Sequence, residues 1–152
     1  MSADASNELA GLARQDEVLQ QSGALAWLPG PAPRRFMIVT SRRTGRWVLP
    51  KGNIDPGMSP PEAAQQEALE EAGVIGQIST EPLGTYRTRK IRPPLFWEVE
   101  VTLFPMEIDE VLDVWIEAEE RERRFVTIDE ARELLADIEI VALVEPFLTR
   151  DE

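Results

Sequence analysis

The sequence predicts an α/β sandwich built around a mixed β-sheet. Short apolar runs that end at proline or glycine predict several strands, whereas only a few segments carry helical signals. These elements lack the regular alternation of β-α-β units, which argues against an all-parallel sheet. The chain has 152 residues and is 43% apolar, which suits one domain with its own hydrophobic core.

The first third of the chain is predicted to hold an arm, two strands and a loop. Residues 1–20 are polar and predict an extra helix or a loose arm, which precedes a single domain over residues 21–152. The apolar runs at 24–28 and 36–40 predict strands, because a proline-rich loop at 29–33 separates them.

The remaining elements follow from similar signals. Further strands are predicted at residues 47–49, 75–86, 95–104 and 125–128. Residues 51–58 contain glycine and proline and predict a loop, and the acidic stretch at 107–122 predicts a solvated loop or partner surface. Helices are predicted at residues 59–72, 128–135 and 141–148.

The composition restricts the chemistry that the chain can use. It contains no cysteine and no histidine, which excludes disulfides, thiolate metal sites and an imidazole base. Any bound metal would have oxygen ligands, which favours Mg²⁺, Mn²⁺ or Ca²⁺. The chain has no apolar run long enough to span a membrane and no signal-peptide pattern, so we expect a cytoplasmic protein that does not bind membranes.

The charge distribution is uneven. The net charge of -12 argues against nucleic-acid binding. Yet six basic residues lie in the acid-free segment 34–51 and four in the acid-free segment 87–92, so these segments hold ten of the sixteen basic residues. They could neutralise a small, highly charged anion, although solvated surface strands would give the same pattern.

The helix predicted at 59–72 has clear signals at both ends. Ser59 and Glu62 form a capping-box pair, and Pro60 falls at the first helical position, where its missing N–H costs nothing. Gly73 suits the left-handed residue that ends a helix. The register of this helix is therefore well determined.

Three carboxylates share one edge of this helix. At about 100° per residue, Glu67, Glu70 and Glu71 fall within roughly a quarter-turn of each other. Like charges at these spacings repel, and the helix has no lysine or arginine to offset them. A divalent cation would make the arrangement favourable, whereas the alternative is a solvated acidic face.

Residues 52–74 resemble the Nudix box, whose pattern is G-x5-E-x7-R-E-U-x-E-E-x-G-U with U a bulky aliphatic residue. The positions that match are Gly52, Glu67, Glu70, Glu71, Gly73 and Val74. The positions that depart are Met58 for the first Glu, Gln66 for the Arg, and Ala68 for the first aliphatic residue. The resemblance implies a Nudix α/β/α sandwich with a central mixed β-sheet and a hydrolase of phosphoanhydride bonds.

Two further segments resemble the branch of diphosphoinositol polyphosphate and dinucleoside polyphosphate phosphohydrolases. Residues 47–52 look like the strand and loop that enter the box, and residues 121–131 are similar to a basic-aromatic strand followed by a helix. The inositol polyphosphate enzymes carry a basic cluster on their first strand, whereas residues 21–26 here are uncharged. The substrate within this branch therefore stays open.

The resemblance also implies roles for single residues. Glu67 and Glu71 would bind metal directly, and a backbone carbonyl near Lys51 and Gly52 would complete the protein ligands. Glu67 and Glu70 are the expected catalytic residues, with Glu70 as either a general base or a further ligand. Mg²⁺ is favoured as the cofactor, with Mn²⁺ as an alternative, because phosphate oxygens and waters can fill an octahedral shell.

Several basic and aromatic residues are candidates for substrate contacts. The basic candidates for phosphate binding are Arg42, Arg89, Lys90, Arg121 and Arg123. Trp97 and Trp115 would either stack on a base or pack against the sheet, with packing favoured. Glu119 or Glu120 is a lesser candidate for a further metal ligand.

Three hypotheses follow for the function. The first is a hydrolase of a polyphosphorylated small molecule, either a dinucleoside polyphosphate or a diphosphoinositol polyphosphate. The second is a hydrolase of a smaller nucleoside diphosphate derivative such as an ADP-sugar, and the third is a non-catalytic Nudix-fold binding module. The basic segments favour the first, and whether the chain forms a homodimer stays open.

Overall fold

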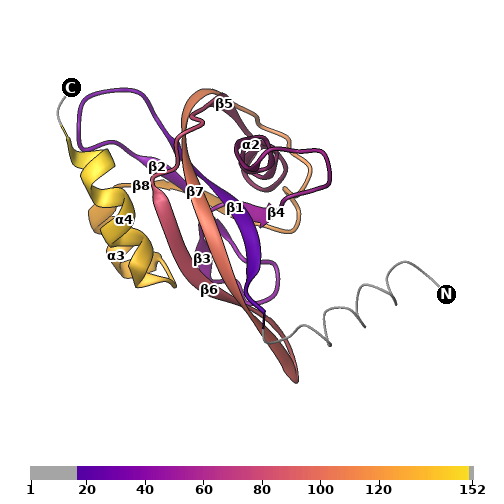
Figure 1. Ribbon diagram of the computed structural model, residues 1–152. Helices are drawn as coiled ribbons and strands as arrows, with labels where there is room; N and C mark the ends of the chain where they lie inside the picture. Colours follow the sequence, from indigo (N-terminus) through magenta and orange to yellow (C-terminus); the bar gives the residue numbers. More distant parts are fainter. Residues whose placement is uncertain (1–16, 151–152) are drawn as a thin grey trace.

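A mixed β-sheet lies between two helical layers in the computed structural model, which describes residues 17–150 (Figure 1). The described strands are β1 (Leu19–Trp27), β2 (Phe36–Thr40), β3 (Trp47–Val48), β4 (Lys51–Asn53), β5 (Val74–Ile78), β6 (Gly84–Arg92), β7 (Leu95–Val111) and β8 (Arg123–Val126). The central order is β3-β2-β1-β7-β5, and β4, β6 and β8 pair with β1, β7 and β2. The pairing of β1 with β7 is parallel and the others are antiparallel, so the predicted mixed sheet is confirmed.

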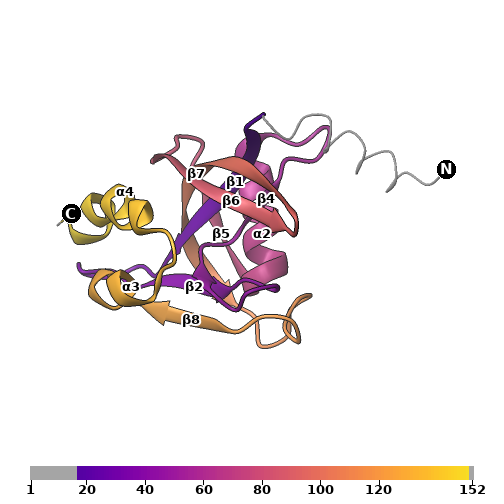
Figure 2. The same ribbon diagram turned by 90° about the horizontal axis from the view of Figure 1, so that it is seen from below.

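The helices cover opposite faces of this sheet. Helix α2 (Pro60–Ala72) lies on one face, whereas α3 (Ile128–Leu134) and α4 (Ile138–Thr149) lie on the other (Figures 1 and 2). Alternate residues of β1 supply the two cores, because successive side chains of a strand point to opposite faces. Ala24 packs with α2, and Leu25 packs with α3 and α4.

Small side chains allow α2 to approach the sheet closely. Ala64, Ala68 and Ala72 are fully buried against β1 and its neighbours. The polar edge of the same helix consequently lies at the border of the packed interface and not on the far solvent side. This placement brings its carboxylates beside β4.

The predicted ends of α2 are confirmed. Ser59 Oγ accepts from the Glu62 backbone N–H at 3.3 Å, and Glu62 Oε1 accepts from the Ser59 N–H at 3.0 Å. These hydrogen bonds lower the pKa of Glu62. Pro60 begins the helix, and Gly73 ends it with a left-handed φ of 66°.

Three sequence predictions about strands were wrong in detail. Residues 51–53 were expected in a loop, but they form β4 because they pair with residues 21–23 of β1. The single strand expected over 75–86 is two strands, β5 and β6, with a break before Gly84. Strand β7 extends to Val111, seven residues beyond the expected end, because β5 pairs with its last part.

Further differences lie near the chain ends. Helix α4 begins at Ile138, three residues before the expected start. The arm predicted at 1–20 lies mostly outside the described residues, and Leu19 and Gln20 belong to β1. In the described part of the chain, no helix is long and apolar enough to cross a membrane.

Candidate active site

A polar cavity of about 650 Å³ lies where β4, α2 and β6 meet. Glu67 and Glu71 of α2 and residues 51–53 of β4 form part of its lining. The two acid-free basic segments meet across it, because residues 42, 43 and 46 line one part and residues 89, 90 and 92 line another. Segments about 45 residues apart in sequence are thus parts of one site.

Gly52 gives the carboxylate of Glu67 its place in this cavity. A β-carbon at position 52 would overlap the Glu67 carboxylate, with even the more distant oxygen, Oε2, only 2.8 Å away. The backbone of Gly52 does not need a positive φ, so the requirement for glycine comes from this close approach alone. The first glycine of the motif is therefore explained by the space that the Glu67 carboxylate requires.

Burial and mutual repulsion disturb the ionisation of the two cavity carboxylates. Burial raises the pKa of Glu67 to about 8, and the nearby carboxylates of Glu71 and Glu70 raise it further. Burial also raises the pKa of Glu71 to about 7, although Arg121 and the Lys51 backbone N–H oppose that rise. A cation bound here, in addition to Arg121, would stabilise both carboxylates in their ionised form.

Glu71 is held at both of its oxygens. Its Oε1 accepts from the Lys51 N–H at 3.3 Å, and its Oε2 lies 3.3 Å from Nη2 of Arg121. Arg121 also lies 2.6 Å from Glu117 Oε1 and donates to the Thr40 carbonyl at 2.9 Å. The side chains of Arg121 and Glu71 are each 8% exposed, so this ion pair is largely shielded from water.

Glu70 is directed differently from its two neighbours. Its Oε2 accepts a hydrogen bond of 2.6 Å from Nε2 of Gln66, and Glu70 does not line the cavity. Within residues 17–150, no group of three acidic side chains is already arranged to hold a metal ion. Glu67 and Glu71 therefore line the cavity as a pair, and Glu70 lies beside them on the same helix.

The last turn of α2 is capped by residues from a distant segment. Helices leave their final carbonyls without intrahelical partners. The carbonyls of Glu70, Glu71, Ala72 and Gly73 accept, in that order, from the Glu117 N–H at 3.1 Å, the Trp115 indole at 3.0 Å, the Arg123 guanidinium at 2.9 Å and the Leu112 N–H at 2.8 Å. We call residues 112–123 the capping segment.

The predicted phosphate contacts divide into three groups. Arg42, Arg89 and Lys90 line the cavity, although Arg42 also lies near Glu117 and Glu120, and Arg89 pairs with Glu98 at 2.9 Å. Arg121 lines the cavity with its guanidinium bound to carboxylates. Arg123 is not part of the lining, because its guanidinium caps α2 and lies 3.8 Å from the centre of the Trp115 ring.

The tryptophans have packing roles. Trp97 is 8% exposed within the sheet, and Trp115 donates to α2 while packing under Arg123. These positions agree with the favoured expectation of packing. Neither Glu119 nor Glu120 lines the cavity, and Glu120 lies 3.7 Å from Arg42.

Sequence reasoning named Lys51 for its backbone carbonyl, but it missed the side-chain contacts that Lys51, Gln21 and Asn53 make at the cavity. Lys51 Nζ donates to Gln21 Oε1 at 3.2 Å, and Gln21 Nε2 donates to Asn53 Oδ1 at 3.1 Å. Burial lowers the pKa of Lys51, and the Glu71 carboxylate opposes this shift. Gln21 reaches the cavity through the β1–β4 pairing, and no local pattern in the sequence signals that contact. Asp137 was also missed.

The donor set of the cavity suits a hard divalent cation. Glu67 and Glu71 present carboxylate oxygens, and Lys51 and Gly52 line the cavity beside them. Mg²⁺ commonly binds one or two protein carboxylates and fills its remaining positions with waters and phosphate oxygens. The residues present therefore fit such an ion.

Comparisons with known proteins identify the family of this chain. The family sequence model described as the NUDIX domain matches residues 21–144. Nudix hydrolase 21, chloroplastic, of Arabidopsis thaliana is 31% identical over 115 residues, which are 75% of this chain and 57% of the relative. Diphosphoinositol polyphosphate phosphohydrolase 3-alpha of Mus musculus is 29% identical over 102 residues, 66% of this chain and 58% of the relative. This chain thus spans somewhat more than half the length of each relative.

A solved structure supports the fold. The Ap4A hydrolase of C. elegans superposes with a TM-score of 0.62 at 17% sequence identity, over 86% of this chain and 96% of that chain. At this low identity the similarity concerns the fold alone. It agrees with the predicted α/β sandwich and its central mixed sheet.

Proposed function

This chain belongs to the Nudix domain family, and from that premise we propose that it is a metal-dependent hydrolase of phosphoanhydride bonds in a polyphosphorylated small molecule. One observation carries the proposal. A single cavity combines two carboxylates from the motif helix with basic side chains from two distant segments. Family members act on small-molecule substrates and generally use divalent metal ions.

The cavity has complementary parts for such a substrate. Eight basic and three acidic side chains line it, although the whole chain has a net charge of -12. Carboxylates at Glu67 and Glu71 suit a cation, and the surrounding guanidinium and ammonium groups suit phosphate oxygens. A substrate whose phosphates bridge both regions would satisfy both parts of the cavity.

A few residues of the site have definable tasks in the proposed reaction. A bound divalent ion would supply positive charge to the phosphates and lower the pKa of water. Glu67 and Glu71 would hold it, with a backbone carbonyl of Lys51 or Gly52 as a further ligand. Arg42, Arg89 and Lys90 would bind and orient phosphates. A carboxylate of Glu67 or Glu70 would accept the proton of the attacking water.

The substrate favoured here has several phosphates beyond the bond that is cleaved. The basic lining supports a dinucleoside polyphosphate or a diphosphoinositol polyphosphate over an ADP-sugar, which has only two phosphates to neutralise. One sequence relative is a diphosphoinositol polyphosphate phosphohydrolase, and its substrate belongs to this class. Mg²⁺ is the proposed ion, with Mn²⁺ as the alternative. A cytoplasmic location and a homodimer stay predictions.

A substrate panel tests the proposal. Diadenosine tetraphosphate, a diphosphoinositol polyphosphate and ADP-ribose would be incubated with the full chain, with Mg²⁺ or after exhaustive chelation. We expect Mg²⁺-dependent cleavage with the higher kcat/KM on one of the longer polyphosphates. Preference for ADP-ribose would favour the smaller substrate class, and tight binding without turnover would favour a binding module.

A further inference from the structure

The structure assigns a role to Arg121 that differs from phosphate binding. We propose that Arg121 is a positioning residue, which holds the Glu71 carboxylate in the orientation that binds the metal. This inference rests on the proposed function. It concerns a residue outside the motif helix, 50 positions after Glu71 in the sequence.

The contacts of Arg121 leave little of its guanidinium for a substrate. Each of its three nitrogens already has an acceptor, namely Glu117 Oε1 for Nε, the Thr40 carbonyl for Nη1 and Glu71 Oε2 for Nη2. The side chain is 8% exposed. By contrast, Arg42 and Arg89 are more than half exposed and can turn toward an incoming anion.

Helix α2 itself provides no cation for Glu71. It contains no lysine or arginine, and its polar residue Gln66 donates to Glu70. Glu71 meanwhile lies among other carboxylates, including Glu67 and Glu117. Without a fixed partner, repulsion would favour rotamers that separate these groups. Arg121 lies between Glu71 and Glu117 and attracts both.

The path of the chain fixes Arg121 relative to the helix. Arg121 belongs to the capping segment, whose residues Trp115 and Glu117 donate to the backbone carbonyls of Glu71 and Glu70. The same segment therefore holds the backbone of Glu71 through Trp115 and its side chain through Arg121. Because Trp115 and Arg121 both hold Glu71, small movements elsewhere in the chain should not displace its carboxylate.

Charge and geometry predict opposite effects when Arg121 is replaced. Arg121→Gln makes the site more negative, so by charge alone it should tighten Mg²⁺ binding. If Arg121 acts by positioning, the same variant should weaken binding. Partners that orient a metal ligand typically contribute about 10–100-fold to metal affinity or activity. The sign of the change thus separates the two roles.

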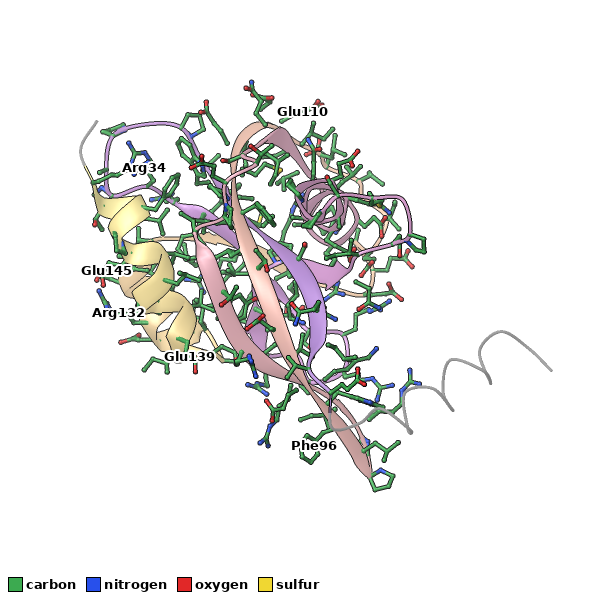
Figure 3. The ribbon with its side chains drawn as sticks, viewed as in Figure 1. Arg34, Phe96, Glu110, Arg132, Glu139 and Glu145 are labelled. Atoms are coloured by element: carbon green, nitrogen blue, oxygen red, sulfur yellow. The ribbon has the colours of Figure 1, made fainter. Side chains whose placement is uncertain are left out.

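The test measures Mg²⁺ binding without substrate. The unfolding temperature of the wild type, Arg121→Gln, Arg121→Lys and Arg34→Gln would be followed as a function of Mg²⁺ concentration. Arg34 is the matched control, because it donates to two carbonyls near the end of α4 and does not line the cavity (Arg34 is labelled in Figure 3). We expect Arg121→Gln to need about tenfold more Mg²⁺ for the half-maximal shift, and Arg34→Gln to match the wild type.

A kinetic measurement completes the design. At saturating Mg²⁺, Arg121→Gln should lower kcat while the KM for substrate stays unchanged, because Arg121 orients a ligand and does not bind phosphate. Arg121→Lys keeps the charge but loses the planar fork, so it should fold and bind Mg²⁺ more weakly than the wild type. If Arg121→Gln does not fold, the Mg²⁺ affinity of Arg121→Lys still tests the proposal.

Several outcomes would overturn the inference. Unchanged or tighter Mg²⁺ binding in Arg121→Gln, or wild-type binding in Arg121→Lys, would show that position 121 does not orient Glu71. A raised KM with unchanged Mg²⁺ binding would make Arg121 a substrate contact. If the wild type itself shows no Mg²⁺ response, the metal-dependent function fails first, so the two failures are distinguishable.

Discussion

The carboxylate of Glu67 occupies the space that a β-carbon on Gly52 would fill. Gly52 belongs to β4, which pairs with β1, and Glu67 belongs to α2, which packs on the same part of the sheet. Two elements that are separately anchored thus meet at one contact. Glu67, a proposed metal ligand, can take this position only because the side chain at position 52 is a single hydrogen atom.

The variant Gly52→Ala tests this dependence. Its β-carbon would force the Glu67 carboxylate to move, because the opposing atoms belong to that carboxylate. We expect a folded protein whose kcat falls by about 10–100-fold, since metal ligands tolerate little displacement. Circular dichroism would verify the fold, and steady-state kinetics at several Mg²⁺ concentrations would measure the loss. Wild-type kinetics would show that Glu67 need not stay at this position.

The raised pKa values of the cavity carboxylates predict how stability depends on pH. Glu67 and Glu71 titrate near 8 and 7 in the folded chain, above the ordinary 4.5. The folded state therefore binds their protons more tightly than the unfolded state does. This contribution to stability is fully present below pH 4.5 and is lost as pH rises through about 7 and 8.

Thermal unfolding measures this effect. In the presence of a chelator, the unfolding temperature should fall as pH rises from about 5 to 8.5. Saturating Mg²⁺ should suppress the decline, because a bound cation stabilises the ionised carboxylates. Glu67→Gln removes one titrating group and should make the metal-free decline shallower. A metal-free unfolding temperature that rises over this range would contradict the prediction.

The basic side chains of β6 predict a dependence on substrate length. Arg89 and Lys90 line the cavity, and Arg89 is 58% exposed and already paired with Glu98. Each side chain should therefore stabilise the bound substrate by only about 1 kcal/mol, which is low for a contact between charged groups. Neutralising both should lower kcat/KM for a substrate with four or more phosphates by about thirtyfold, and for ADP-ribose far less.

A matched double variant controls for the change in net charge. Arg124 and Arg132 are half-exposed arginines with carboxylate partners, and neither lines the cavity (Arg132 is labelled in Figure 3). Replacing both with glutamine should leave the preference between substrates unchanged. Added salt should shrink the effect of the β6 variant, because screening weakens exposed contacts. Equal losses on both substrates would refute the proposed preference for long polyphosphates.

Features encoded by neighbouring residues were predictable from the sequence. The start and end of α2 follow from the Ser59–Glu62 capping pair and from the Gly73 N–H, whose hydrogen-bond partners lie at most five positions away. The angular grouping of Glu67 and Glu71 follows from helix geometry. The sequence could not separate Glu70 from this pair, because the hydrogen bond from Gln66 is one of several possible rotamer choices.

Features that depend on distant pairing were not predictable. Residues 51–53 read as a loop by composition, and only the pairing with β1 makes them a strand. Arg121 and Arg123 lie in one short basic stretch with Arg124, and their basic character alone suggested phosphate contacts. The capping segment instead directs them to Glu71 and to the end of α2, contacts that span about 50 residues.

We propose that the cavity of Glu67 and Glu71 is a metal-dependent hydrolytic centre. The most direct measurement is the rate of diadenosine tetraphosphate or diphosphoinositol polyphosphate cleavage by wild type and Glu71→Gln over a series of Mg²⁺ concentrations. Glutamine keeps the shape of the side chain and removes its charge. We expect wild-type activity to require Mg²⁺ and Glu71→Gln to lose most of it, while keeping or gaining thermal stability in metal-free buffer. Turnover by Glu71→Gln equal to that of the wild type at saturating Mg²⁺, or full wild-type activity after exhaustive chelation, would contradict the claim.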